Sequence, residues 1–408
     1  MKKTLLFLLC FLLVSASVFA GCSRGEEKAY YFNTDTGCLL GNTLYQSMGG
    51  DYFVWNPDAE EIRYGLCRDA LCTHKDTDSI CPDNVWLWNK TVITDGEKLF
   101  LNVQNALLTD VNGAMFRQIY SMKPDGTEFR LLYTYEASGN TSPVMRCMDG
   151  YLYFEQGFYR KDPENLTNLN DQYKNILRIS TGGGKPEVVI GEEMNMNSTY
   201  YIDETKEYLV SEEESCLTVT DRETGIVTRQ CDIEGIPVFV RIYEGQTYLI
   251  AAKPITVVGT RADGSEARKR FDSYILYRLE HNEFQKLAEG VFTFTLDGIW
   301  SSEVSYDYIG TKSAQEGAYG ETEEKDYFSV TTKKLYKMTE NGKQVEEIRL
   351  GEDFRYGDEI EIVSGANGKL LVNCSNQKQF FETGDSQYRT CLLAVKDGSV
   401  IIEKIYEN

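Results

Sequence analysis

The stretch Ile119-Tyr-Ser-Met-Lys-Pro-Asp-Gly-Thr-Glu-Phe-Arg-Leu-Leu132 is the clearest copy of a pattern that returns along the chain. Two alternating apolar runs flank residues that tolerate a tight turn, and this arrangement predicts a β-hairpin. We expect the same hairpin in five further copies and in a weaker first copy. These copies span residues 176–190, 217–231, 275–287, 335–350 and 391–405, and the weaker one spans residues 52–64.

A second predicted hairpin precedes each of the last six copies. Its turns fall at Asp95-Gly96, Asp149-Gly150, residues 203–206, Glu244-Gly245, Asp297-Gly298 and Asn367-Gly368. The repeating unit is therefore four antiparallel strands, and it returns about every 40–68 residues, as propeller blades do. We expect an all-β propeller of seven such blades, with six or eight as alternatives. The propeller forms a single domain over residues 30–408, and its first strand, at residues 30–32, is predicted to pair with the last blade.

The connections between the predicted strands differ in length. If the strands of a blade are lettered A to D from the axis outward, the A–B and C–D turns lie on one face and the B–C loops on the other. Only the B–C loops are long, and one-sided insertions commonly mark a binding face. The long loops are predicted at residues 104–115, 157–173, 253–272, 306–325 and 376–388.

Aromatic residues in these loops are candidate contacts, because exposed aromatic rings stack on sugars or anchor protein partners. The alternative is that they fold back onto the rim of the propeller. The candidates are Phe158, Tyr159, Tyr306, Tyr308, Tyr319, Phe380 and Phe381.

The N-terminus predicts where the protein works. Lys2 and Lys3 precede an apolar run that ends in Phe19-Ala20-Gly21-Cys22, the pattern of a bacterial lipoprotein signal. The run is shorter than the roughly 20 residues that a spanning helix needs. We therefore expect a signal peptide over residues 1–21 and a mature chain that starts at Cys22. Its thiol would carry a diacylglyceryl group, with acyl chains such as palmitate, and residues 22–29 would link this anchor to the propeller at the outer face of the cytoplasmic membrane.

The composition is acidic and typical of strands. The chain of 408 residues has a formal net charge of −21 and 27 tyrosines. Such a surface repels nucleic acids and anionic lipid head groups, so no nucleic-acid partner is expected. Tyrosine, valine, isoleucine and threonine favour sheet over helix.

The densest motif in the sequence is Cys67-Arg-Asp-Ala-Leu-Cys72-Thr-His74, followed by Cys81. Three thiolates and an imidazole are a possible zinc site, although structural zinc sites favour closer cysteine pairs. A structural disulfide is the preferred interpretation, with Cys72–Cys81 or Cys67–Cys81 as the pair. The loop connects the first two predicted blades and is expected on the face of the long loops.

Other cysteines are candidates for cross-links in an extracytoplasmic protein. Cys374 and Cys391 flank the last long loop and could bridge it. Cys216 and Cys231 lie on neighbouring outer strands, and the register of that hairpin decides whether they meet. An odd number of cysteines, nine, remains after Cys10 in the signal and Cys22 are set aside. At least one thiol is therefore left free or pairs between molecules.

A resemblance appears at this point. The run from Leu66 to His74, the later Cys81-Pro82, the lipoprotein signal and the hairpin at residues 119–132 resemble a group of bacterial β-propeller lipoproteins of Gram-positive anaerobes. That group carries a DUF5050-like domain of unknown function, and Ala70 stands where it is expected to have proline. The resemblance implies a propeller at the cell surface and brings no active site or cofactor.

Catalytic motifs are absent from the sequence. His74 and His281 are its two histidines, and His281 is expected to cap an exposed turn. No Walker loop, HExxH motif or EF-hand loop occurs. The sequence therefore favours binding of a protein partner or a glycan through the long-loop face. A carbohydrate-active enzyme is the alternative, because carboxylate pairs are defined in space rather than by spacing.

Overall fold

The computed structural model describes residues 31–33, 37–48, 51–56, 61–69, 71–75, 81–109, 115–137, 145–159, 172–195, 198–211, 214–243, 245–281, 283–295, 298–315, 322–338, 344–351, 354, 358–366, 368–384, 388–396 and 398–406. The predicted signal, Cys22, the linker and Tyr319 lie outside these residues. Among the described helices, none is long and apolar enough to cross a membrane.

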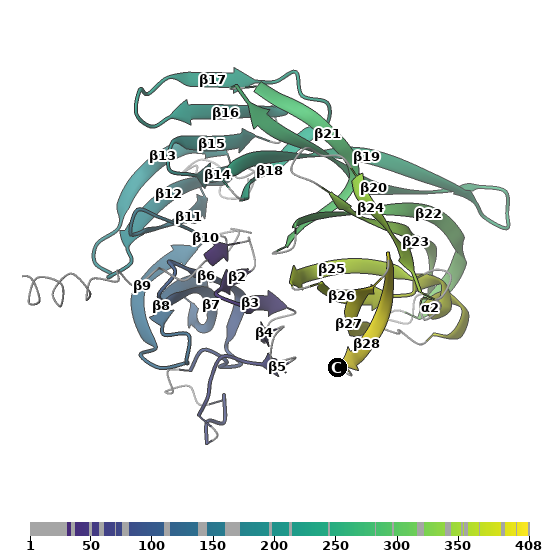
Figure 1. Cartoon of the computed structure of the whole chain (residues 1–408), viewed down its shortest axis with the longest axis horizontal. Helices are drawn as coiled ribbons and strands as arrows, with labels where there is room; N and C mark the ends of the chain where they lie inside the picture. Colours follow the sequence, from purple (N-terminus) through teal and green to yellow (C-terminus); the bar gives the residue numbers. More distant parts are fainter. Residues whose placement is uncertain are drawn as a thin grey trace, which may run out of the picture.

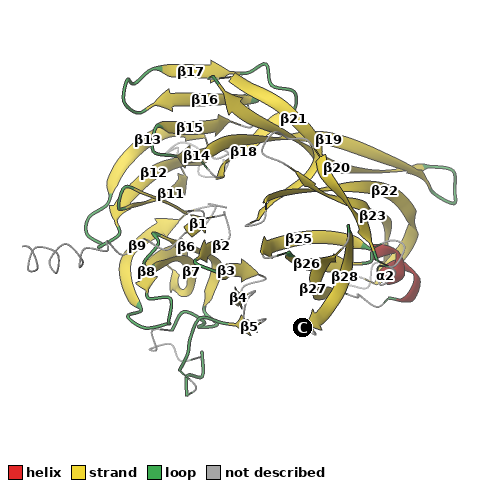
Figure 2. Cartoon of the chain, viewed as in Figure 1, coloured by secondary structure: helices red, strands yellow, loops and turns green. Residues whose placement is uncertain are grey.

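The described chain is almost entirely strands, and its sheets are arranged around a common centre (Figures 1 and 2). The fold is a β-propeller, as the hairpin pattern predicts. The first sheet has five strands in sequence order, all antiparallel. They are β1 (Tyr31–Asn33), β2 (Gly37–Leu40), β3 (Thr43–Met48), β4 (Asp51–Asn56) and β5 (Glu61–Tyr64).

Three four-stranded antiparallel sheets follow, each in sequence order. The second sheet has β6 (Leu87–Thr94), β7 (Leu99–Thr109), β8 (Met115–Met122) and β9 (Arg130–Ala137). The third has β10 (Met145–Met148), β11 (Tyr151–Tyr159), β12 (Gln172–Ser180) and β13 (Glu187–Asn195). The fourth has β14 (Ser198–Ile202), β15 (Lys206–Ser211), β16 (Cys216–Asp221) and β17 (Val227–Gln230).

The remaining strands form one continuous sheet of eleven. Its strands are β18 (Ile236–Tyr243), β19 (Gln246–Thr260), β20 (Glu266–Glu280), β21 (Glu283–Thr295), β22 (Gly298–Gln315), β23 (Thr322–Met338), β24 (Gln344–Leu350), β25 (Glu359–Ala366), β26 (Lys369–Ser375), β27 (Arg389–Lys396) and β28 (Ser399–Tyr406). It consists of three antiparallel groups, β18 to β21, β21 to β24 and β25 to β28. The first two share β21, which leaves β20 at Gly290 and then pairs with β22. The last two are joined by a short parallel contact between β24 and β28. Because these groups are continuous, the number of blades stays a prediction.

The hairpins occur at the predicted positions. The stretch at residues 119–132 forms β8, a turn and β9. In the turn, the Asp125 carboxylate accepts hydrogen bonds from the backbone N–H of Thr127 at 2.9 Å and from its hydroxyl at 2.6 Å. Gly126 has a φ of 88°, a conformation that favours glycine. Local turn chemistry therefore fixes this hairpin, and the other predicted hairpins also pair as expected.

Most central strands bury both faces, since consecutive residues pack in different clusters. In β7, Leu99 and Leu101 pack with residues of the first sheet, whereas Phe100 packs with the third sheet. In β4, Phe53 and Trp55 pack against Leu371 and Leu392 of the last group. Side-chain packing thus brings the first sheet and the last group of strands together.

The predicted pairing of the first strand with the last blade is wrong. β1 pairs with β2, Tyr31 opposite Leu40, and not with the last group. Asn33 at its end exchanges hydrogen bonds with the backbone of Thr94 in β6, at 2.9 and 2.8 Å. β1 therefore begins the first sheet, and β5 becomes an additional fifth strand at its outer edge.

The closure contact predicts a stability effect. Leu371 is fully buried between the last group and the first sheet. We expect Leu371→Ala to lower the free energy of unfolding by about 2–5 kcal/mol, because it leaves a cavity in this contact. Urea unfolding measures the effect. The same change at Leu131, which is 46% exposed in β9, is the control and stays within about 0.5 kcal/mol of the parent. Equal losses in the two variants would contradict closure by packing.

One disulfide is present among the described cysteines, between Cys216 of β16 and Cys231, directly after β17. Leu217 pairs with Gln230, so this register places the two cysteines opposite each other, with Cα atoms 4.3 Å apart. The register of β16 and β17, which could not be predicted from the sequence, thus allows the two cysteines to form a disulfide.

The bridge predicts that Cys216→Ser destabilises the protein. The two cysteines are 15 residues apart, and a loop of that size corresponds to about 3 kcal/mol. Urea unfolding with and without reductant measures the effect: the reductant-sensitive loss in the parent matches the loss caused by the variant. Peptide mapping without reductant that recovers the two cysteines on separate, unlinked peptides would contradict the bridge.

Candidate functional site

Two of the predicted long loops are paired β-arms. Residues 253–260 of β19 pair with residues 266–273 of β20, and residues 306–315 of β22 pair with residues 322–330 of β23. In Figure 1 the β19–β20 arm extends away from the ring. The β-branched stretch Thr256-Val257-Val258 and the Asp263-Gly264 turn carry the signal of a hairpin. This local signal was available in the sequence.

The two arms are joined by aromatic rings and one ion pair. Phe271 of β20 stacks near Tyr306 of β22, with ring centroids 4.6 Å apart. Arg261, at the tip of the first arm, bonds Asp326 of the second at 2.5 Å through Nη2, and Nε donates to it at 2.9 Å. These contacts fix the arms side by side.

A short helix, α2 (Gln377–Thr383), covers the β22–β23 arm from the last group. Asn376 caps it by accepting from the Gln379 backbone N–H at 2.8 Å. Phe381 lies 5.4 Å from the ring of Tyr327, and Lys312 lies above its face at 4.5 Å. This helix stands where the last predicted B–C loop was expected.

The structure describes the side chains of four of the aromatic residues predicted to bind a partner or glycan. Tyr306, Tyr308, Phe380 and Phe381 are partly exposed and pack within or against the arms, as the alternative interpretation expected. Phe158 and Tyr159 end β11, and their side chains lie outside the described features. A role of these six residues in binding stays a prediction.

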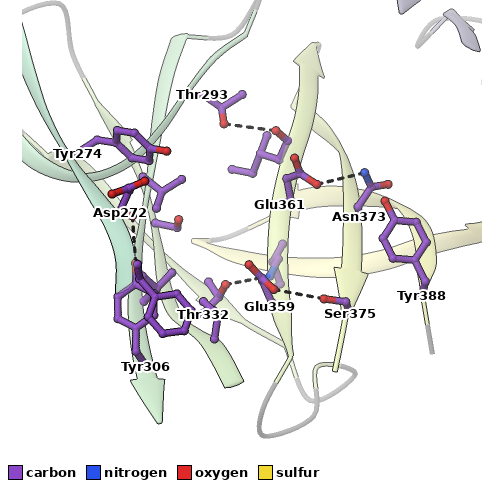
Figure 3. Close-up of a pocket in the computed structure, with 17 residues that line it drawn as sticks. Asp272, Tyr274, Thr293, Tyr306, Thr332, Glu359, Glu361, Asn373, Ser375 and Tyr388 are labelled. Atoms are coloured by element: carbon purple, nitrogen blue, oxygen red, sulfur yellow. Dashed lines mark hydrogen bonds between the residues drawn. The ribbon is translucent and has the colours of Figure 1, made fainter. Parts of the chain in front are cut away.

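A cavity of about 500 Å³ lies where β20 to β23 face β25 and β26. Figure 3 shows Asp272, Tyr274 and Tyr306 on one wall and Glu359, Glu361 and Tyr388 on the other. Serine, threonine and asparagine side chains complete the polar lining, and valines and isoleucines supply apolar surface. No lysine or arginine is among the described lining residues. Apart from Tyr306, these residues are not recognisable as a site in the sequence, because only folding brings them together.

The acidic side chains of the cavity are held by neighbouring polar groups. The Ser375 hydroxyl donates to Glu359 at 3.3 Å, and the Asn373 amide donates to Glu361 at 3.4 Å. Burial raises the pKa of Glu359 above its ordinary value of 4.5. Burial also raises the pKa of Tyr274, Tyr306 and Tyr388, so these phenols keep their protons at neutral pH. The cavity therefore combines protonated phenols with carboxylates and has no fixed positive charge in its described lining.

The raised pKa of Glu359 predicts a pH dependence of stability. Between its ordinary pKa of 4.5 and the raised one, the folded state holds a proton that the unfolded state has lost. The contribution of Glu359 to stability is therefore largest below this window and falls as the pH rises through it. Glu359→Gln removes the titration, so the stability of the parent relative to this variant should decrease from acidic toward neutral pH in urea unfolding. A relative stability that increases with pH would contradict the prediction.

Cys67, Cys72, His74 and Cys81 come together in the structure. Their ligand atoms all lie within 4.8 Å of one another. The predicted bridges Cys72–Cys81 and Cys67–Cys81 are not formed, and all three cysteines are free.

The position of this loop also differs from the expectation. The carbonyl of Leu66 and the side chain of Arg68 lie beside Gly126, in the short β8–β9 turn. The loop thus starts on the side of the short turns. The fifth strand of the first sheet explains this, because each added antiparallel strand reverses the face from which the chain leaves a sheet.

Cys374 and Cys391 are also free, and both are buried. Val372 pairs with Cys391 and Cys374 pairs with Arg389, so the two cysteines are diagonal neighbours on adjacent strands. They are not directly opposite, as Cys216 and Cys231 are, and the predicted cross-link is not formed.

Comparisons with known proteins bear on the fold alone. No protein-family model and no curated protein matches the chain. Among solved structures, YjhT is similar over 92% of this chain and 98% of its own, with 11% identity and a TM-score of 0.36. The β-propeller domain of the trilobed protease from Pyrococcus furiosus covers 77% of this chain and 84% of its own, with 12% identity and a TM-score of 0.38. KlHsv2 with loop 6CD replaced by a Gly-Ser linker covers 90% of this chain and 95% of its own, with 8% identity and a TM-score of 0.43.

Proposed function

We propose that this protein is a lipid-anchored, extracytoplasmic propeller that binds a neutral glycan in the cavity between β20 to β23 and β25 and β26. The observation that carries this proposal is the lining. Tyr274 and Tyr388 offer flat apolar rings, and Asp272, Glu359 and Glu361 offer hydrogen-bond acceptors. Sugar rings have apolar faces and outward hydroxyl groups, and this combination matches them.

The charge of the cavity narrows the class of glycan. Three carboxyl groups, with no lysine or arginine in the described lining, would repel uronates, sialic acids and phosphorylated sugars. A volume of about 500 Å³ is within the usual range for small-ligand sites. The proposed ligand is therefore a short neutral or amino-sugar segment.

Binding of a protein partner through the arms and α2 is a weaker proposal. Its predicted anchors Tyr306, Tyr308, Phe380 and Phe381 are engaged in holding the arms and α2 together. Anchor residues of protein interfaces usually insert their rings into the partner. Because these rings already pack against one another, the cavity is a better candidate for the binding site than the surface of the arms.

A carbohydrate-active enzyme is the second candidate, and one observation favours it. Glu359 has a raised pKa, as a general acid requires, and it lies across the cavity from Asp272 (Figure 3). Release of reducing ends from a bound glycan, lost in Glu359→Gln, would identify catalysis. Binding without product would identify a lectin-like function.

The cavity predicts that Tyr388→Ala weakens glycan binding about tenfold, through loss of one stacking ring worth roughly 1.4 kcal/mol. A glycan array screens neutral and amino-sugar ligands, and calorimetry on a hit measures the affinity. Tyr64→Ala is the matched control, since Tyr64 in β5 is 55% exposed and Tyr388 is 49% exposed. If no neutral or amino-sugar glycan binds, or if both variants weaken binding equally, the proposal fails.

The anchor is tested separately. We propose that the protein is held at the outer face of the cytoplasmic membrane through Cys22, on the strength of the signal sequence. Mass spectrometry of the N-terminal peptide should show a diacylglyceryl-modified Cys22. In Cys22→Ala the protein should leave the membrane fraction. A mature N-terminus at another residue would contradict the anchor.

A further inference from the structure

The strongest unassigned feature is the cluster of Cys67, Cys72, His74 and Cys81. One ligand atom from each residue lies within 4.8 Å of the others, and His74 Nδ1 is 3.2 Å from Cys81 Sγ. In a tetrahedral site of three sulfurs and one nitrogen, bonds of about 2.3 Å to sulfur and 2.0–2.1 Å to nitrogen place neighbouring ligand atoms roughly 3.5–3.8 Å apart. The four ligand atoms thus converge on one point, at separations within about an ångström of those around a bound zinc ion.

The backbone of the loop is organised to bring these side chains together. The Asp83 carboxylate accepts hydrogen bonds from the N–H groups of Leu66, at 2.9 Å, and Cys67, at 2.5 Å. This contact ties the start of the loop to its end. The backbone N–H of Val85 donates to the carbonyl of His74 at 2.9 Å. His74 has a φ of 56°, which is uncommon for a residue other than glycine, and such strain persists where the surroundings hold it.

Hydrogen bonds around the second cysteine complete this frame. The backbone N–H of Cys72 donates to the carbonyl of Asp69 at 3.1 Å, and the N–H of Leu71 donates to the Asp69 carboxylate at 2.9 Å. At Cys81, the backbone N–H of Asn84 donates to the cysteine carbonyl at 3.2 Å. Each of the four candidate ligands is therefore placed by backbone contacts of its own or of its neighbours.

We propose that these four residues bind one Zn²⁺ ion in a Cys₃His site. A disulfide would use two of the three thiols and leave the third beside an imidazole with no bonding partner. A soft divalent cation uses all four groups at once. Four protein ligands fill the tetrahedron, so the site is closed to substrate and structural in kind.

The metal would fasten the connection between the first and second sheets. Leu66, next to Cys67, is buried in the core cluster that these sheets share, and Cys81 is also buried. Zinc bound here would hold the described residues on both sides of the site against that core. This inference is independent of the glycan proposal, because the cavity is lined by β20 to β26 and Tyr388.

The test uses the full-length chain purified in detergent under reducing, oxygen-free conditions. We expect one zinc per chain by elemental mass spectrometry. X-ray absorption at the zinc edge should give a first shell of three sulfurs at about 2.3 Å and one nitrogen at about 2.0–2.1 Å. Removal by a chelator should lower the melting temperature, and added Zn²⁺ should restore it. A reduced, folded protein that takes up no stoichiometric zinc, or a shell of oxygen and nitrogen alone, overturns the proposal.

Variants locate the site. After replacement of zinc by Co²⁺, the thiolate-to-cobalt absorption should be lost or strongly reduced in Cys72→Ser and altered in His74→Asn. Cys147→Ser, at a cysteine in β10 of another sheet, is the matched control and should keep this absorption. An unchanged spectrum in folded Cys72→Ser and His74→Asn would assign the metal elsewhere and overturn the proposal. If the variants do not fold, the absorption spectrum of the parent protein decides alone.

Discussion

Each sheet of this protein has two apolar faces, and burial of both is the constraint on which the structure depends. Leu99, Phe100 and Leu101 show it within one strand, since neighbours in sequence pack against different neighbouring sheets. A strand of this kind cannot lie at the surface of a two-layer sandwich, where one face meets water. Only a ring of sheets, in which the last also meets the first, gives every apolar face a partner. The packing of Trp55 and Phe53 against Leu371 and Leu392 meets that requirement.

The five strands of the first sheet have a consequence for the loop that follows. An even number of antiparallel strands would release the chain on the face where the next sheet begins. The odd number releases it at Leu66, beside the β8–β9 turn, and the chain must return before β6 starts at Leu87. The long connection between Tyr64 and Leu87 is thus needed to cross the molecule. The described residues of this segment form no strand and therefore have few backbone hydrogen bonds of their own, so cross-linking by a metal would contribute most here.

Sequence reasoning succeeded where the determinant is local. Turn residues and alternating apolar runs fixed the hairpins, including the one at residues 119–132, because a tight turn and its two strands are encoded within a dozen or so residues. It failed for the partner of β1, since several strand edges compete for a short apolar strand and only the packed ring decides between them. It also treated residues 253–272 as a loop, although Thr256-Val257-Val258 and Asp263-Gly264 carry the same local hairpin signal as the blades. The cavity could not be predicted from the sequence, because Asp272 and Glu359 are far apart in sequence and face each other only in the folded protein.

The cysteines show why spacing alone separates disulfides from metal sites poorly. Cys216 and Cys231 lie directly opposite each other on paired strands. This geometry brings only two sulfur atoms together, and they form a disulfide. Cys67, Cys72 and Cys81 lie on irregular backbone that converges on one point, where a third sulfur and an imidazole compete for any pair. Convergence of four groups favours a central ion over a two-centre bond, because the ion satisfies all of them. A thiolate bound to a metal ion is protected from oxidation, so a bridged pair and an unbridged cluster can coexist in one chain.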